Sequence, residues 1–496
     1  EFKYWLTNNF FDKKDDNYLN NNFNLTLNNV KLNVIFESIK TLLRSILIEA
    51  DWYVSSLNPE DLNDFEFCIQ NYFKQKELKN NNSNNSLLNA INLMTENFNK
   101  ISTLGLNVNR NNEQNKVAIK LNENSNEIKV LQGPAGCGKT KIMFDFIKHN
   151  KSFNTNKKVF IICPRQVICE SLFNELTSSS YFLEAKDLKI ELFNSSEHKI
   201  FLNKKTNDYD NSHRNNSLKS DINITTIDQI VSLINSHNRM NVFTDLMSGY
   251  LIVDEYHELF DLHNLVFIFK ELLLIKQMMN ETNTLLVSAT PNYFFTKKIL
   301  DIDEKNIKKI KSFNEKIINV NLIESDYLHF ENSKNGEIYI YNTAINSQLN
   351  TISLLNDRKN KGLNVINFHS KLNDDDRKLS FDKIMKNFKK DNFTREFNIQ
   401  SGPLLQASVN ISTDNMFTEI SSPENLLQRI GRLNRFGEFE NNKSKINIYY
   451  SSFLDKKSNI NIMLSKNNIY EQSVNFIKYL INHFKSTSFS LTLNEF

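Results

Sequence analysis

The stretch VLQGPAGCGKTKIMFDF, from Val130 to Phe146, decides the fold of this chain. It holds three of the ten glycines in the chain, and its centre, Gly133–Thr140, matches the pattern G-x-x-x-x-G-K-[S/T]. The residues before this centre have the apolar pattern of a strand, and those after it have the pattern of a helix. Glycine allows the turn in which successive backbone N–H groups converge on phosphate oxygens, beside the positive end of the helix dipole. The stretch therefore predicts a phosphate-binding loop between a strand and a helix.

The residues of this loop have distinct expected roles. Lys139 is expected to contact the outer phosphates of a nucleotide, and the hydroxyl of Thr140 is expected to be a ligand of Mg²⁺. The backbone of the loop cradles the phosphates. The predicted nucleotide-binding residues of the loop are Gly133, Pro134, Ala135, Gly136, Cys137, Gly138, Lys139 and Thr140.

A second stretch, GYLIVDEYHELF, supplies the carboxylates that nucleotide hydrolysis needs. Its apolar run from Tyr250 to Val253 is typical of a strand and ends at Asp254 and Glu255. We expect Asp254 to hold Mg²⁺ through its water shell and Glu255 to polarise the attacking water. Two acidic residues after a strand are more often a solvated strand end, but the phosphate loop favours the catalytic interpretation.

Strands and helices alternate along the rest of the chain. The apolar segment TLLV ends before Ser288–Thr290, and the alternation predicts a parallel α/β sheet with its ligand at the carboxyl ends of the strands. After about Ile310 the alternation repeats without a second phosphate loop. We therefore expect two α/β halves, of which only the first has a phosphate loop of its own.

The segment QRIGRLNRFG in the second half contains a polar pattern of interest. Gln428, Arg432 and Arg435 have spacings of three and four, which predict that they share one face of a helix. Such a face is usually a solvated surface. The alternative is that the two guanidinium groups neutralise charge on the γ-phosphate from an opposing lobe, because the phosphate site of the first half is incomplete.

Composition limits the class of protein. The chain has 496 residues, enough for two or three domains, and a formal net charge of +3, so a nucleic-acid partner must be held by local basic patches. Its four cysteines lack paired C-x-x-C spacing, as expected for reduced thiols in the cytoplasm. No apolar run is long enough to span a bilayer, and no signal peptide is recognisable, so we expect no membrane partner. The chain begins at Glu1 without a methionine, and we expect the natural protein to extend further toward its N-terminus.

The motifs taken together resemble a known series. GPAGCGKT, PRQVICESL, NITTIDQ, DEYH, SAT, FHS and QRIGRLNR resemble, in this order, the motifs of superfamily two helicases. The resemblance implies two RecA-like lobes that bind ATP between them and move along nucleic acid. It implies that Gln114 reads the adenine, an ordinary surface glutamine being the alternative. It also implies that Arg165, Thr226 and Ser370 contact nucleic acid.

Within the superfamily the chain is similar to the CRISPR-associated type I helicase-nuclease, or Cas-three, family. DEYH has the form D-E-x-H, YNTAINSQ resembles the signature that opens the second lobe of that family, and FHSKLNDDDR resembles a later segment. The segment from Leu47 to Ser56 resembles the helix that closes the HD nuclease domain, the alternative being an amphipathic packing helix. These likenesses imply single-stranded DNA as substrate, the CRISPR RNA-guided surveillance complex (Cascade) as partner and a possible separate HD nuclease subunit.

The chain also departs from the family. In GPLLQASVN, Gly402 stands where the family has threonine, Gln406 where it has glutamate and Asn410 where it has aspartate. An amide cannot accept hydrogen bonds as a carboxylate does, so the link between nucleic acid and the ATP site is expected to be altered, the alternative being a harmless variant of this lineage. None of the nine histidines is followed by aspartate, so we expect no HD nuclease activity from this chain alone.

The sequence therefore predicts an α/β protein with two RecA-like parallel-sheet lobes and a mainly helical N-terminal segment. The expected domains are 1–104, a helical segment like the end of an HD domain, 105–305 and 306–455, the two lobes, and 456–496, a helical extension. The expected function is ATP-dependent translocation on single-stranded DNA in CRISPR interference. The alternatives are a superfamily two enzyme that acts on RNA or in phage or repair DNA processing, and a nucleotide-binding scaffold without turnover.

Overall fold

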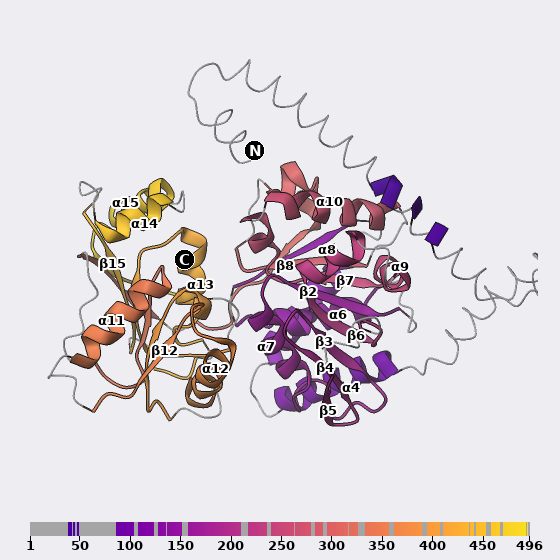
Figure 1. Cartoon of the computed structure of the whole chain (residues 1–496), viewed down its shortest axis with the longest axis horizontal. Helices are drawn as coiled ribbons and strands as arrows, with labels where there is room; N and C mark the ends of the chain where they lie inside the picture. The colour runs from indigo at the N-terminus through magenta and orange to yellow at the C-terminus, as the bar shows by residue number, and fades with distance from the viewer. Residues whose placement is uncertain are drawn as a thin grey trace, which may run out of the picture. The chain divides into compact units, whose positions relative to one another are not determined.

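The chain divides into two compact units in a computed structural model (Figure 1). The first unit comprises Glu1–Gln132 and Lys139–Lys309, and the second comprises Gly133–Gly138 and Ile310–Phe496. The structure describes residues 38–41, 43–44, 47–48, 86–103, 108–123, 127–134, 136–150, 157–209, 217–235, 240–261, 263–278, 283–290, 295–315, 317–325, 333–356, 362–388, 394–406, 410–435, 437–440, 443–452, 458–466, 470–492 and 494.

The described residues before position 104 are all helical, as the sequence predicts for this segment. They include α4, Ser86–Thr103. Of the segment Leu47–Ser56, which resembles the helix that closes an HD domain, only Leu47 and Ile48 belong to the described residues. The predicted likeness of this segment to a nuclease domain stays a prediction.

The first unit is built on a nine-stranded sheet in the order β5-β4-β3-β6-β2-β7-β8-β1-β9. Only the pairs β3–β4 and β4–β5 are antiparallel, so the strands from β3 to β9 in this order form a parallel sheet. The strands are β1 Lys129–Gln132, β2 Val159–Cys163, β3 Ile190–Phe193, β4 His198–Leu202, β5 Lys205–Asp208, β6 Ile222–Thr226, β7 Tyr250–Val253, β8 Thr284–Ser288 and β9 Ile307–Lys309.

Helices cover this sheet because its central strands are apolar on both faces. Side chains of α8, α9 and α10 form one large buried cluster with those of the central strands, and in Figure 1 these helices lie along one side of the sheet. The helices are α5 Val108–Leu121, α6 Lys139–Lys148, α7 Gln166–Leu176, α8 Ile227–Asn235, α9 Met240–Ser248 and α10 His263–Met278, with shorter turns η3 Tyr256–Asp261, η4 Phe295–Ile299 and η5 Glu304–Asn306.

The second unit has a seven-stranded sheet in the order β12-β13-β11-β14-β15-β10-β16, in which only β16 is antiparallel to its neighbour. This topology confirms the predicted α/β fold with two largely parallel sheets. The elements are β10 Ile318–Glu324, β11 Ile338–Ile340, α11 Ala344–Asn356, β12 Val365–Phe368, α12 Asp374–Phe388, β13 Asn398–Ser401, η7 Pro403–Gln406, β14 Asn415–Glu419, α13 Pro423–Ile430, β15 Ser444–Tyr450, α14 Asn459–Lys466, α15 Tyr470–Phe484 and β16 Ser488–Leu491.

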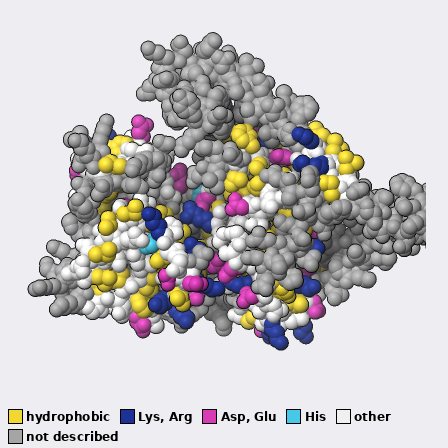
Figure 2. Space-filling model, in the orientation of Figure 1, with side chains coloured by type: hydrophobic (Ala, Val, Ile, Leu, Met, Phe, Trp, Pro, Cys, Tyr) yellow, Lys and Arg dark blue, Asp and Glu magenta, His cyan; other side chains and the backbone are white. Residues whose placement is uncertain are grey.

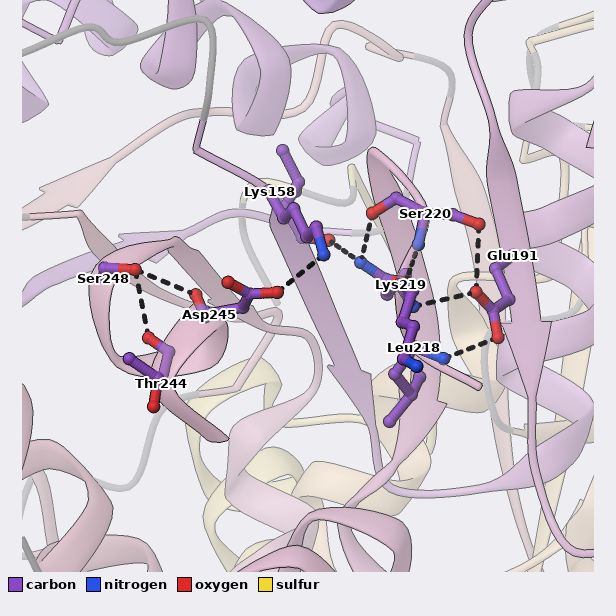
Figure 3. Close-up of polar contacts among 10 residues, drawn as sticks. Lys158, Glu191, Leu218, Lys219, Ser220, Thr244, Asp245 and Ser248 are labelled. Carbon is purple, nitrogen blue, oxygen red and sulfur yellow. Dashed lines mark hydrogen bonds and ion pairs between the residues drawn. The ribbon is translucent and has the colours of Figure 1, made fainter. Parts of the chain in front are cut away.

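A buried carboxylate fixes the chain where it enters β6 (Figure 3). Glu191 on β3 accepts hydrogen bonds from the backbone N–H of Leu218 at 2.6 Å and from Ser220 Oγ at 2.9 Å. It also contacts His198 Nε2 on β4 at 3.0 Å. Burial by itself raises the pKa of Glu191, but these hydrogen bonds hold that pKa below its ordinary value. The Glu191 carboxylate therefore holds the residues that lead into β6, whose last residue is Thr226.

Charged side chains of both signs lie interspersed on the face seen in Figure 2. This pattern agrees with the small net charge of the chain, +3. Among the helices that the structure describes, none combines the length and the apolar character that a bilayer crossing needs.

Candidate active site

The phosphate loop follows β1 and leads into α6. Gly136 and Gly138 have φ angles of +79° and +86°, in the left-handed region that favours glycine. A Cβ at Gly133 would lie 2.6 Å from Sγ of the buried Cys137, so a side chain is excluded there. Ala135 lies outside the described residues. The loop therefore has the backbone that the sequence pattern predicts, and its nucleotide-binding role stays a prediction.

Lys139, the first residue of α6, contacts the acidic pair that follows β7. Its Nζ lies 3.2 Å from Glu255 Oε1, and both side chains are largely buried. The backbone N–H of Glu255 donates to Asp254 Oδ1 at 3.0 Å, which fixes the two carboxyl groups relative to each other. The structure thus brings together three predicted catalytic residues, one from the phosphate loop segment and two from DEYH.

The two carboxyl groups differ in their electrostatic environment. Burial, followed by the charge of Glu255, raises the pKa of Asp254 to about 7. Burial acts on Glu255 in the same direction, but the charge of Lys139 and the neighbouring His257 hold its pKa below the ordinary value. Glu255 is therefore the group that stays a carboxylate and can accept a proton from water at neutral pH.

The donor set fits Mg²⁺. Thr140 in the first turn of α6 offers a hydroxyl oxygen, and Asp254 after β7 offers a carboxylate, and both are hard oxygen ligands. The low-dielectric surroundings that raise the pKa of Asp254 would also strengthen its interaction with a cation. Among the described residues no group of three or more His, Cys, Asp or Glu side chains is placed to hold a metal ion.

His257 is a residue of this site that the sequence analysis did not single out. Its Nδ1 lies 2.8 Å from Ser288 Oγ and 3.5 Å from Glu255 Oε2. Ser288 Oγ in turn accepts from the N–H of Thr290 at 3.0 Å. These contacts join DEYH to the SAT segment at the ends of the neighbouring strands β7 and β8. The signal for His257 was its place as the last residue of the D-E-x-H motif.

Gln114, the predicted adenine-reading residue, lies on α5. Its side chain is only 3% exposed, so Gln114 is not an ordinary surface glutamine. Contact with adenine stays a prediction for this residue.

The predicted nucleic-acid contacts of the first unit lie at the ends of adjacent strands. Cys163, the last residue of β2, pairs with Thr226, the last residue of β6. Arg165 comes two residues after β2, and Thr226 is buried. Gln166, next to Arg165, accepts a 2.9 Å hydrogen bond from Ser196 in the turn after β3. Ser370, the third predicted contact, is exposed after β12 of the second unit.

The expectation that Gln428, Arg432 and Arg435 share a helix face is wrong. Helix α13 ends at Ile430, and Arg432 and Arg435 follow it in a turn. The helix stops there because the chain pairs with the segment that precedes β14, where the backbone N–H of Thr413 donates to the carbonyl of Arg432 at 3.1 Å. Arg432 is 3% exposed, so it does not belong to a solvated surface either.

Arg435 is held by two polar residues that precede β14. Its backbone N–H donates to Ser412 Oγ at 2.9 Å, and its Nη2 donates to Asn410 Oδ1 at 2.7 Å. The amide at position 410 therefore accepts a hydrogen bond although it lacks the charge of the aspartate that the family has. At Gly402, a Cβ would lie 3.4 Å from the Cβ of His369, close to van der Waals contact. Gln406 ends η7, and its side chain lies outside the described set.

Arg429 is the other residue that the sequence analysis passed over. Its side chain is fully buried, with Nη1 donating to Thr418 Oγ1 at 2.8 Å and to the carbonyl of Glu419 at 2.9 Å, and Nη2 donating to Asn342 Oδ1 at 2.9 Å. Burial lowers its pKa to about 10, although the charge of Glu419 opposes the shift. Glu419 also accepts a 2.6 Å hydrogen bond from the N–H of Asn342. Arg429 thus ties α13 to the ends of β11 and β14.

Comparison with known proteins places this architecture among helicases. Residues 84–293 match the family model described as the res subunit of type III restriction enzymes. Residues 334–438 match the model described as the C-terminal part of the CRISPR-associated nuclease/helicase Cas3. A candidate CRISPR-associated nuclease/helicase Cas3 from Methanocaldococcus jannaschii is 26% identical over 396 residues, which cover 74% of this chain and 52% of that protein.

Solved structures share the fold. The crystal structure of T. fusca Cas3 with ATP matches with a TM-score of 0.56 at 13% identity, covering 76% of this chain and 50% of that one. A chain of a CRISPR RNA-guided surveillance complex in a pre-nicking state matches with a TM-score of 0.50 at 13% identity, covering 71% and 46%. The present chain spans about half the length of these relatives. The comparisons confirm the predicted resemblance to superfamily two helicases and to the Cas-three family.

Proposed function

We propose, from the premise that this chain is a Cas3-like helicase of superfamily two, that it is an ATP-dependent translocase on single-stranded DNA in a type I CRISPR interference system. The observation that carries the proposal is the 3.2 Å contact between Lys139 Nζ and Glu255 Oε1. It joins the segment that would bind phosphate to the residue that would activate water.

Residues of the proposed first lobe, 105–305, have separate roles in ATP hydrolysis. The N–H groups of the Gly133–Gly138 loop and Lys139 bind the phosphates, and Gln114 contacts the adenine. Glu255, whose carboxylate form is favoured by Lys139 and His257, accepts a proton from the attacking water. Bound Mg²⁺ would supply neutralisation of phosphate charge, and Thr140 and Asp254 are the residues that would hold it.

The second lobe contributes its guanidinium groups. Arg432 and Arg435 stabilise the negative charge that develops on the transferred phosphoryl group, and Gln428 contacts the same nucleotide. Arg429, which donates hydrogen bonds to Thr418, Glu419 and Asn342, has a structural role and holds the segment that leads to Arg432 and Arg435.

Nucleic acid is held by its backbone. Arg165, Thr226 and Ser370 contact phosphates and sugars, which carry no base identity, so binding depends on salt and little on sequence. The partners we propose are single-stranded DNA, the Cascade surveillance complex and a separate HD nuclease subunit, in the cytoplasm. The domain limits proposed are those predicted from the sequence, with lobes at 105–305 and 306–455.

The test is ATP turnover by the purified chain with single-stranded DNA, single-stranded RNA or neither. We expect DNA to stimulate turnover more than RNA does, and Lys139→Ala to abolish it. Lys116→Ala, at an exposed lysine paired with Glu113, is the matched control and should behave as wild type. Stronger stimulation by RNA would favour an RNA helicase, and turnover that neither nucleic acid changes would contradict the translocase.

We also propose that this chain by itself cuts no DNA, because none of its nine histidines precedes an aspartate. Incubation with single-stranded DNA, ATP and a panel of divalent metals should leave the DNA intact. Metal-dependent cleavage that persists in Lys139→Ala would show a nuclease centre independent of ATP and would overturn this part of the proposal.

A further inference from the structure

Arg165 contacts a carboxylate that follows the DEYH motif. Its Nε donates to Glu258 Oε2 at 2.6 Å, which joins residues 93 positions apart in the chain. Arg165 is the N-cap residue of α7, just after β2, and Glu258 lies in η3, just after β7. Strands β2 and β7 are neighbours in the sheet, so the ion pair spans two adjacent strand ends.

The two partners differ in their exposure to solvent. The side chain of Arg165 is 36% exposed, whereas that of Glu258 is only 10% exposed. The contact with Glu258 is made through Nε, the inner nitrogen of the guanidinium. A planar guanidinium held at Nε has its orientation set, and its terminal nitrogens are the groups that can meet a phosphate in a two-point contact.

Glu258 has a second set of ties, to the catalytic segment. Its backbone N–H donates to the carbonyl of Glu255 at 3.0 Å, and its neighbour in the chain, His257, contacts Ser288. Burial raises the pKa of the Glu258 carboxyl, while Arg165 and His257 act in the opposite direction. The backbone of Glu258 is thus tied to the catalytic segment and its side chain is largely buried, so Glu258 is the more rigid partner of the pair.

We propose that Glu258 is a positioning residue that orients the guanidinium of Arg165 toward a phosphate of the nucleic-acid backbone. The proposal rests on the proposed function, in which Arg165 contacts that backbone. An arginine side chain loses rotamer freedom when it binds, and an ion pair made beforehand removes part of this cost. The alternative is a purely structural role, in which the Arg165–Glu258 ion pair only stabilises the first lobe.

The proposal predicts a specific pattern of binding. Glu258→Ala releases the guanidinium without removing its charge, so affinity for single-stranded DNA should fall by about three- to tenfold while the salt dependence stays that of wild type. Glu258→Gln keeps an oxygen acceptor and should bind DNA close to wild type. Arg165→Ala removes a phosphate contact and should reduce the slope of log K against log salt by about 0.7.

The experiment measures DNA affinity at several salt concentrations for wild type, Glu258→Ala, Glu258→Gln, Arg165→Ala and the double alanine variant. Glu258→Ala should have no further effect on affinity in the Arg165→Ala background. In the ATPase assay, Glu258→Ala should raise the DNA concentration for half-maximal stimulation and leave the rate at saturating DNA unchanged. Thermal melting of each variant reports any purely structural role.

Three results would overturn the inference. The first is that Glu258→Ala binds single-stranded DNA as tightly as wild type or more tightly. The second is that Glu258→Ala lowers the ATP turnover rate at saturating DNA without changing the DNA concentration for half-maximal stimulation, and the third is that the two alanine substitutions have additive effects on DNA affinity. A different result would contradict the proposed function: ATP turnover by the wild-type chain that single-stranded DNA does not stimulate.

Discussion

The amide oxygen of Asn410 accepts a 2.7 Å hydrogen bond from Nη2 of Arg435. This bond joins the segment before β14 to the segment after α13. It fixes the direction of the Arg435 guanidinium, which we propose to act on phosphate. Asn410→Ala should therefore reduce kcat for ATP several-fold with little change in KM, since it acts through Arg435. Asn410→Asp retains an acceptor and should keep more activity than Asn410→Ala. Steady-state ATPase assays check this order, and equal activity of both variants and wild type would contradict it.

Lys139→Ala and Glu255→Gln should both abolish ATP turnover, by different routes. The lysine variant loses a phosphate partner and should bind nucleotide weakly. The glutamine variant loses the proton acceptor and should bind nucleotide as wild type does. Titration with a fluorescent ATP analogue separates binding from turnover, and normal turnover in either variant would refute the assignment of that residue.

Arg432→Ala and Arg435→Ala should each lower turnover by roughly 10³-fold or more, the effect of removing an arginine that stabilises phosphoryl transfer. Lys443→Ala, at an exposed lysine paired with Glu440 in the same lobe, is the control. Single-turnover hydrolysis at saturating ATP is the measurement. Near-normal rates in both arginine variants would leave these residues with a structural role alone.

Arg429→Ala should destabilise the second lobe by about 3–5 kcal/mol, because it leaves the buried partners of a charged group without their donor. Denaturant unfolding measures the change, with Lys443→Ala as a surface control. Arg429→Lys should recover little of the loss, since one ammonium cannot reproduce the three bonds to Thr418, Glu419 and Asn342. Wild-type stability of Arg429→Ala would be inconsistent with the buried network.

Stability of the first lobe should depend on the ionisation of Glu191. Its pKa is lowered from 4.5 in the folded chain. The contribution of the ionised carboxylate to the free energy of unfolding is therefore fully present above about pH 4.5, and it is lost as the pH falls through the pKa of the folded state. Glu191→Gln should cost about 1–3 kcal/mol near pH 7, and the difference from wild type should shrink below pH 4.5. Urea unfolding across this range is the measurement. A difference that is constant with pH would show that the charge of Glu191 is not involved.

The sequence by itself determined the features that depend on short-range chemistry. The Gly133–Thr140 pattern indicated the phosphate loop because left-handed turns require glycine at positions such as Gly136 and Gly138. The apolar run before Asp254 indicated a buried parallel strand, and with it the edge of the sheet at which the acidic pair lies. Both inferences need only residues that are close together in the chain.

Only the tertiary structure decided where distant residues meet. The spacing of Gln428, Arg432 and Arg435 favoured a continuous helix, but α13 ends at Ile430 because the following residues bond to the chain before β14. A charged side chain is ordinarily exposed, so burial of Arg429 could not be read from its neighbours. The Arg165–Glu258 pair likewise exists because β2 and β7 are adjacent in the sheet, a relationship set by packing across the chain and not by spacing along it.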